Sequence, residues 1–192
     1  MVIESLARTE TTSKNQSLLT GEDLYALGDI GRTELVKGVL VNMAPTGHPH
    51  GFVEFNIGGI LRNFVRQHGL GRVMGGEVGI YTSRNPDTVR GADVVFISHA
   101  RMAQVESHSF LDVAPELVVE ILSPDDTWRQ VNDKLEEHFH LGVKLIWVVD
   151  PIRQLVYVYE TIEQASRLTT AETLTGGEVL PGFAVMVAEL FV

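Results

Sequence analysis

Two carboxylates lie inside segments whose other residues are strongly apolar. Asp93 precedes the run VVFI at 94–97, and Glu120 stands within LVVEI at 117–121. Both segments have the β-branched composition typical of buried strands. Because an unpaired carboxylate is costly to remove from water, such groups are kept where they meet a partner, a metal or a reacting group. Asp93 and Glu120 are therefore the first candidates for a functional site.

The positions of these acids within their segments predict that they come together. Asp93 lies near the beginning of its segment and Glu120 near the end of its own. Antiparallel pairing would bring both to one end of a sheet, where opposed Cβ atoms lie about 4.5–5.5 Å apart and two carboxylates can share one hard cation. Parallel pairing would separate them. Two strand-end acids paired with arginines also fit the same pattern.

Two further charged residues are candidates for the same site. Lys134 follows Val131 in a segment with helical spacing, so its stem can run along the core while its ammonium reaches outward. From Thr127 to Lys134 a helix rises about 10 Å, which is near the limit for reaching Glu120. Glu34 opens an apolar segment. Each has a simpler interpretation as well, Lys134 as a surface lysine paired with an acid and Glu34 as a charge at a strand start.

Other common catalytic arrangements lack support. His138 and His140 would point to different faces of a helix, and His48 and His50 flank a proline in an expected turn, so their spacing argues against a zinc site. No Gly-x-Ser-x-Gly elbow surrounds Ser123, and no Gly-x-x-x-x-Gly-Lys-Ser/Thr phosphate-binding loop occurs.

The charge balance limits how a nucleic acid could bind. A net charge of −10 argues against a protein whose whole surface attracts a polyanion. A local basic groove near Asp93 is still compatible with five arginines in the middle third of the chain, as are scattered, solvated arginines. These residues are Arg62, Arg66, Arg72, Arg84 and Arg90.

Composition predicts an ordinary globular protein. The 192 residues, 44% hydrophobic and 21% charged, show no break in composition, so we expect a flexible polar leader over 1–19 and a single domain over 20–192. The absence of cysteine excludes disulfides and thiolate zinc sites. No apolar run approaches the roughly 20 residues needed to span a bilayer, and residues 1–17 do not resemble a signal peptide. We therefore expect a cytoplasmic protein that does not enter a membrane.

Hydrophobic spacing and turn residues predict the elements that must position these candidates. A short helix is expected after Thr20, a hairpin over 34–43 turning at Lys37-Gly38, and a helix over about 52–67 ending at Gly69. Strand-like runs are expected near 72–81, 89–97, 116–122, 144–149 and 155–159.

A second helix is expected from about residue 128, ending at Gly142. Its possible capping residues are Ser123, Asp125 and Asp126. The final apolar run, Phe183 to Val192, has a strand-like composition and could belong either to the core or to an interface.

The ordered set of motifs resembles the Uma-two family of restriction endonucleases. The blocks that carry the resemblance are Glu34-Leu35 with Gly38, the 45–51 turn with His50, 93–97, 115–124, Lys134-Leu135 and 142–151. The resemblance covers roughly residues 20–192 and implies the PD-(D/E)XK nuclease superfamily. Its core is an α/β (α+β) restriction-endonuclease-like fold, a mixed sheet flanked by helices, here with an N-terminal β-hairpin.

The resemblance also implies roles for the candidate residues. Asp93 would be the aspartate of the first half-motif and Glu120 the acid of the second, both holding Mg²⁺ (or Mn²⁺) with the Ile121 carbonyl. Lys134 matches a lysine that has moved to the following helix. Glu34 matches a glutamate near the metal. The implied activity is metal-assisted hydrolysis of phosphodiester bonds in nucleic acid, DNA in the first instance, with RNA or a nucleotide left open.

Two positions depart from the family's pattern. Ala92 replaces a proline that shapes the backbone and binds nothing. Leu122 stands where the standard motif has lysine, which leaves open a catalytically weak or inactive nuclease-fold binding or regulatory module. A twofold homodimer is a further expectation, because nucleases that cut both strands often act as dimers.

Overall fold

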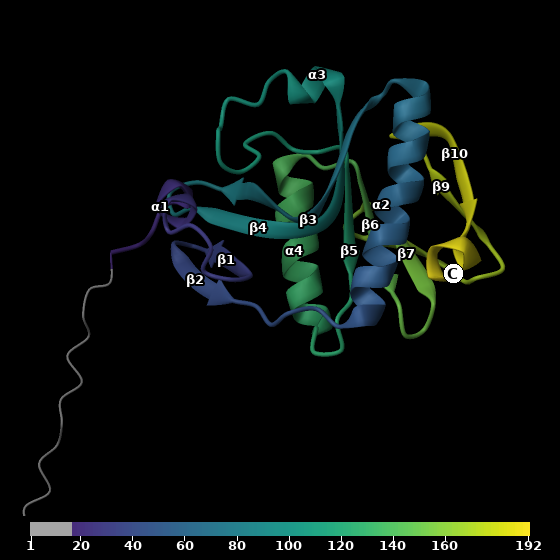
Figure 1. The fold of residues 1–192 in the computed structure, drawn as a ribbon, viewed down its shortest axis with the longest axis horizontal. Helices are drawn as coiled ribbons and strands as arrows, with labels where there is room; N and C mark the ends of the chain where they lie inside the picture. The colour runs from purple at the N-terminus through teal and green to yellow at the C-terminus, as the bar shows by residue number, and fades with distance from the viewer. Residues whose placement is uncertain (1–16) are drawn as a thin grey trace, which may run out of the picture.

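The computed structural model describes residues 17–192, as a mixed β-sheet with one long helix on each face (Figure 1). These helices are α2 (His48–His68) and α4 (Trp128–Leu141). Most of the leader expected over 1–19 lies outside the described residues, because residues 1–16 are not among them.

The sheet of the described residues contains eight strands in the order β2-β1-β4-β5-β6-β7-β8, with β3 paired to β4. Their bounds are β1 (Thr33–Val36), β2 (Val39–Asn42), β3 (Gly71–Ser83), β4 (Thr88–Ser98), β5 (Leu117–Ile121), β6 (Leu145–Asp150), β7 (Leu155–Thr161) and β8 (Gln164–Leu168). β5 and β6 run parallel, whereas the other neighbours run antiparallel. The expected α+β fold, with a mixed sheet flanked by helices and an N-terminal hairpin, is confirmed.

Smaller elements complete the fold. They are α1 (Gly21–Ala26), α3 (His99–Met102), the paired strands β9 (Thr173–Gly176) and β10 (Leu180–Met186), and a 3₁₀ helix (Val187–Phe191).

Two hydrophobic cores explain why the central strands read as continuous apolar runs. Val94 and Phe96 of β4 pack in the core that contains α2, whereas Val95 and Ile97 pack in the core that contains α4. A strand buried on both faces needs apolar residues at successive positions. Asp93, next to this run, is buried with only 4% of its surface exposed.

Local signals predicted most element ends. Thr20 caps α1, accepting a hydrogen bond from the Asp23 amide in a capping box. Lys37 and Gly38 form the hairpin turn with φ of 50° and 78°, as a two-residue turn of this kind requires. Gly69 and Gly142 end α2 and α4 in the left-handed conformation.

Two expectations about helix starts were wrong. α2 begins at His48, so the expected turn around Pro49 is the first turn of the helix. Proline is well tolerated there because the first helical amides have no partner within the helix. The cap of α4 is Thr127, whose hydroxyl accepts from the Gln130 amide, and not Ser123, Asp125 or Asp126.

The final apolar run contributes to the core. Phe183, Val185, Val187 and Leu190 are buried in the core that contains α2, and residues 187–191 form the 3₁₀ helix where a strand was expected. Among the described residues, no helix is both long and apolar enough to cross a membrane.

Candidate functional site

The pairing of β4 with β5 brings the two carboxylates together at the end of the paired segment, although Asp93 lies in the middle of β4 and not near its beginning. The strands are antiparallel, with Val94 opposite Val119 and Val95 opposite Val118. Asp93 and Glu120 are the next residues outward along the two strands. The antiparallel pairing expected from their positions is confirmed, and both residues line one cavity of about 280 Å³.

Glu120 faces two partners on α4, Lys134 and His138. Its Oε2 lies 3.2 Å from Lys134 Nζ, and its Oε1 lies 3.3 Å from Nε2 of the fully buried His138. Burial alone would raise the pKa of Glu120, but the charge of Lys134 and the hydrogen bond from His138 outweigh it and lower the pKa to about 2. Glu120 is therefore a carboxylate at neutral pH.

Lys134 is held between two acids. Its Nζ lies 3.0 Å from Glu34 Oε1 and donates to the Gly91 carbonyl at 3.4 Å, in addition to its contact with Glu120. Burial would lower the pKa of Lys134, but Glu120 and Glu34 raise it far above its ordinary value. The side chain is therefore an ammonium group that can stabilise negative charge and cannot accept a proton.

Glu34 is buried and fully engaged. Beyond Lys134, it accepts from Arg90 at 2.9 Å and from the Gly91 amide at 3.2 Å. Arg90 also forms two hydrogen bonds of 2.7 Å with Glu137 of α4. Glu34 thus ties β1 to the strand that carries Asp93 and to α4.

Asp93 makes a different set of contacts. Its Oδ2 accepts a 2.6 Å hydrogen bond from the Ile121 amide, and its Oδ1 lies 3.3 Å from His50 Nε2. The Ile121 amide therefore fixes the rotamer of Asp93, a contact that was not expected from the sequence.

His50 lies between Asp93 and a second acid on its own helix. Its Nδ1 is 3.9 Å from Glu54 Oε2, and His50, Glu54 and Asp93 each offer a ligand atom within 4.8 Å of the others. Burial would lower the pKa of His50, but Asp93, Glu54 and Glu77 together raise it. Nδ1 is buried and has no hydrogen-bond partner among residues 17–192, so a bound cation would satisfy it. A nitrogen with two carboxylates suits Mn²⁺ better than Mg²⁺.

A bulge in β3 brings a further acid to the cavity. The register with β4 shifts between Gly75 and Val78, and Gly76 and Glu77 have φ of 83° and 62°. Glu77 lines the cavity and is ion-paired with Arg32. Burial and the charge of Asp93 raise the pKa of Glu77 to about 7, against the opposing effect of Arg32. Gathered acids of this kind are the usual surroundings of a divalent cation.

The five arginines considered for a basic groove divide into two groups. Arg90 forms ion pairs with Glu34 and Glu137. Arg84 lies over the Tyr81 ring, and its guanidinium is 3.2 Å from the Asp87 carboxylate. Neither forms part of a basic groove beside Asp93. Arg62, Arg66 and Arg72 line one hollow farther along α2.

The structure brings Glu34, Glu120 and Lys134 into direct contact and places Asp93 in the same cavity. Sequence reasoning missed four residues around them: His50, Glu54, Glu77 and His138. His138 follows Lys134 by four residues, so the shared helix face was a usable signal. His140 indeed faces elsewhere, against the Glu136 carbonyl. His50 had no local signal, because its partner Asp93 is distant in the chain.

Comparisons with known proteins identify the family and support the fold. The profile of a family described as "Uma2: Putative restriction endonuclease" matches residues 22–188. A crystal structure of "a putative nuclease belonging to DUF820" from Anabaena variabilis superposes with a TM-score of 0.76 at 17% sequence identity, covering 90% of this chain and 97% of that chain. At this identity the likeness shows the fold alone. No curated protein matches.

Proposed function

We propose that this chain, which belongs to the family described as "Uma2: Putative restriction endonuclease", is a metal-dependent endonuclease that hydrolyses phosphodiester bonds in DNA. One observation carries the proposal. Two carboxylates on the paired strands β4 and β5 line a cavity together with Lys134, whose ammonium is held in place by Glu34.

In this proposal Asp93 and Glu120 hold Mg²⁺ or Mn²⁺ together with the Ile121 carbonyl. Ionised carboxylates are the ligands that these hard cations prefer. When bound, the cation supplies a Lewis acid for a phosphoryl oxygen and lowers the pKa of a bound water. His50 positions Asp93 and is a further candidate ligand when the cation is Mn²⁺.

The cationic side chain of the site has one role that fits its charge. Lys134 cannot act as a base, because it is fully protonated, so it would stabilise negative charge developing on the phosphate oxygens. Glu34 would remain its partner when the oxygens of Glu120 turn toward a cation. Arg90 holds Glu34 in turn.

Cleavage assays on plasmid, linear and single-stranded DNA test the proposal. With Mg²⁺ or Mn²⁺ the wild-type protein should cut, and EDTA should abolish cutting. Asp93→Asn and Glu120→Gln should each lower the cleavage rate by about 10³-fold or more, because each removes the negative charge of a metal ligand while keeping the shape of the side chain. The exposed Glu163→Gln is the matched control. Activity that survives in both site variants would refute the proposal.

A second candidate function is a binding or regulatory module with little catalytic power. Two observations favour it. Leu122 stands in the lysine position of the standard motif, and Lys134 is already ion-paired with Glu34 and Glu120. Calorimetric titration with Mn²⁺ addresses it. Saturable binding that is lost in Glu120→Gln, without cleavage of any DNA, would favour this module over a nuclease.

A further inference from the structure

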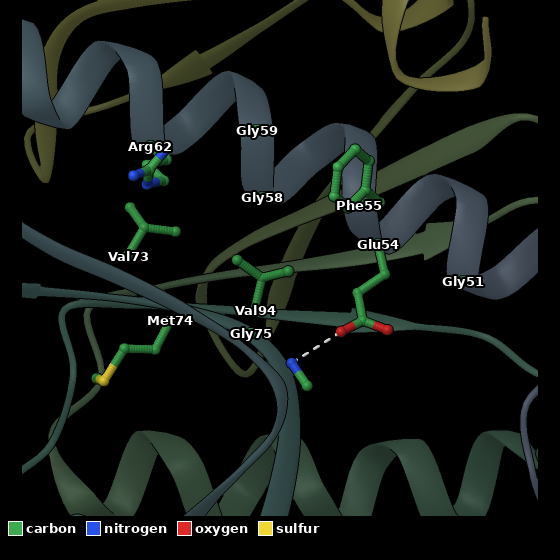
Figure 2. A pocket seen from close by; sticks show the side chains of 11 residues that line it. Gly51, Glu54, Phe55, Gly58, Gly59, Arg62, Val73, Met74, Gly75 and Val94 are labelled. Carbon is green, nitrogen blue, oxygen red and sulfur yellow. Dashed lines mark hydrogen bonds between the residues drawn. The ribbon is translucent and has the colours of Figure 1, made fainter.

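A groove between α2 and β3 lies beside the cavity that contains Asp93 (Figure 2). Its volume is about 500 Å³, within the range of sites that hold small organic groups. Figure 2 shows Glu54 and Phe55 toward one end and Arg62 toward the other, with Val73, Met74 and Val94 opposite the helix.

The helix wall of this groove has little side-chain bulk. Gly58 and Gly59 face it from α2 and Gly75 from β3. A Cβ atom at Gly58 would have only Val94 Cγ2 as a neighbour, at 4.0 Å, and one at Gly59 would meet nothing within 4 Å. A flat group can therefore lie against the backbone here, over an apolar floor.

An aromatic ring stands exposed on the edge of the groove. Phe55 is 81% exposed, although α2 has a buried face that the neighbouring Val53 and Ile57 occupy. A phenylalanine in this position contributes little to folding and leaves its ring face available to a ligand.

The far end of the groove is basic. Arg62 lines both the groove and the next hollow along α2, which is also lined by Arg66, Arg72 and His99 and by no acidic residue. Within residues 17–192, the side chains of Arg62, Arg66 and Arg72 form no ion pair or hydrogen bond. In a chain of net charge −10, three such neighbouring arginines are available to an anion.

The near end of the groove adjoins the proposed catalytic cavity, since Gly51 and Gly76 line the groove and their chain neighbours His50 and Glu77 line the cavity. Glu54 Oε1 accepts a 2.8 Å hydrogen bond from the Gly76 amide, and its Oε2 faces His50. Gly76 is followed by Glu77, which lines the cavity of Asp93. The surface thus passes from the acidic cavity, over an apolar stretch with an exposed ring, to three arginines.

We infer that this groove binds an unpaired segment of the DNA strand, with a base stacked on Phe55 and its phosphates contacted by Arg62, Arg66 and Arg72. An aromatic platform beside a positively charged track is how proteins hold single strands without reading sequence. A duplex keeps its bases stacked and would present only phosphates. That the strand is a substrate rests on the proposed nuclease function, whereas its binding does not.

Binding of fluorescein-labelled oligothymidine, followed by fluorescence anisotropy in EDTA, tests this inference without cleavage. Phe55→Ala should weaken binding about tenfold, because stacking of each base on an aromatic ring supports affinity. Phe52→Ala, a half-exposed phenylalanine of the same helix that does not line the groove, is the matched control and should bind like wild type. A duplex of the same length should bind more weakly and be unaffected by Phe55→Ala.

The salt dependence tests the arginines separately. The variant with Arg62, Arg66 and Arg72 all changed to Gln should reduce the slope of log K against log salt by about 2, since each phosphate contact to a single strand contributes about 0.7. Arg167→Gln on β8, outside the groove, should leave the slope unchanged.

Wild-type affinity for oligothymidine in Phe55→Ala and in the triple variant would overturn the inference, as would the absence of any single-strand binding by wild type. These outcomes are distinct from failure of the nuclease proposal. A protein that cuts DNA normally without Phe55 and the arginines retains the nuclease function and lacks the strand site. A protein that binds strands through them and cuts nothing retains the strand site alone.

Discussion

The two faces of the sheet use charge in opposite ways. On the α4 face, Glu34, Arg90, Glu120, Lys134 and Glu137 are joined in one network of short contacts. On the α2 face, the exposed arginines beyond the apolar groove have no partner among residues 17–192. Charges that satisfy one another hold a geometry, whereas charges left to solvent are available to a ligand. The α4 face is therefore suited to the proposed chemistry, and the α2 face to the proposed binding of a strand.

Removing Lys134 should give the largest effect on stability and should also lower the cleavage rate. Lys134→Met leaves Glu34 and Glu120 buried without their shared cation, so we expect a loss of about 3–5 kcal/mol in unfolding free energy. In protein that remains folded, cleavage should fall by about 10²–10³-fold. Urea unfolding and DNA cleavage measure the two effects, with the exposed Lys144→Met as control. A Lys134→Met variant as stable as wild type would contradict the claim that the charges on the α4 face hold the fold together.

His138→Ala should have the next largest effect, through Glu120. Without the imidazole, Glu120 Oε1 loses its 3.3 Å partner, and outer partners of this kind typically contribute 10- to 100-fold in metal affinity. Titration calorimetry with Mn²⁺ should therefore show affinity weaker by about that factor. His140→Ala, on the exposed side of the same helix, should bind Mn²⁺ like wild type. Equal affinity in the two variants would count against the role of His138.

The pH dependence of stability should reveal the Arg90–Glu137 pair. Burial would raise the pKa of Glu137, but its hydrogen bonds and ion pair with Arg90 lower it below the ordinary value. A lowered acid pKa gives stability that is complete above the ordinary glutamate range and is lost as pH falls through the folded pKa. Urea unfolding from pH 7 to pH 3 should thus show a shallower loss in Glu137→Gln than in wild type. The exposed neighbour Glu136→Gln should keep the wild-type slope.

The smallest effect on stability is expected for the arginines of the α2 face. Arg72→Gln should change the unfolding free energy by no more than about 0.5 kcal/mol, as exposed substitutions without partners usually do. Thermal unfolding without DNA measures it. A loss as large as that of Lys134→Met would mean that these arginines also serve the fold, and the contrast between the faces would disappear.

Much of the fold was predictable because its signals are local. Thr20, the Lys37-Gly38 turn, Gly69 and Gly142 each mark an element end through their own backbone or side-chain chemistry. The start of α2 was missed because Pro49 is read as a turn residue when its place in the helix is unknown. β8 was missed because its burial is slight and its residues, QASRL, carry no apolar alternation.

The candidate site was predictable only where one strand pair or one helix face sets the geometry. Antiparallel pairing determines that Asp93 and Glu120 lie at one end, and helical rise limits how far Lys134 can reach. His50 and Glu77 enter the cavity through α2 docking on the sheet and through a β-bulge. Both placements depend on tertiary structure, which the spacing of residues in the sequence does not show.

The bulge in β3 indicates that this protein gives up stability to keep Glu77 in the cavity. Glu77 has a φ of 62°, a conformation that disfavours side chains other than glycine by about 1–2 kcal/mol. A Cβ atom at Gly91 would lie 2.6 Å from Glu77 Oε2, so a larger residue there would displace the Glu77 carboxylate from its present position. Selection for thermal robustness alone would therefore favour Glu77→Gly, and a more stable but less active protein would be its expected product.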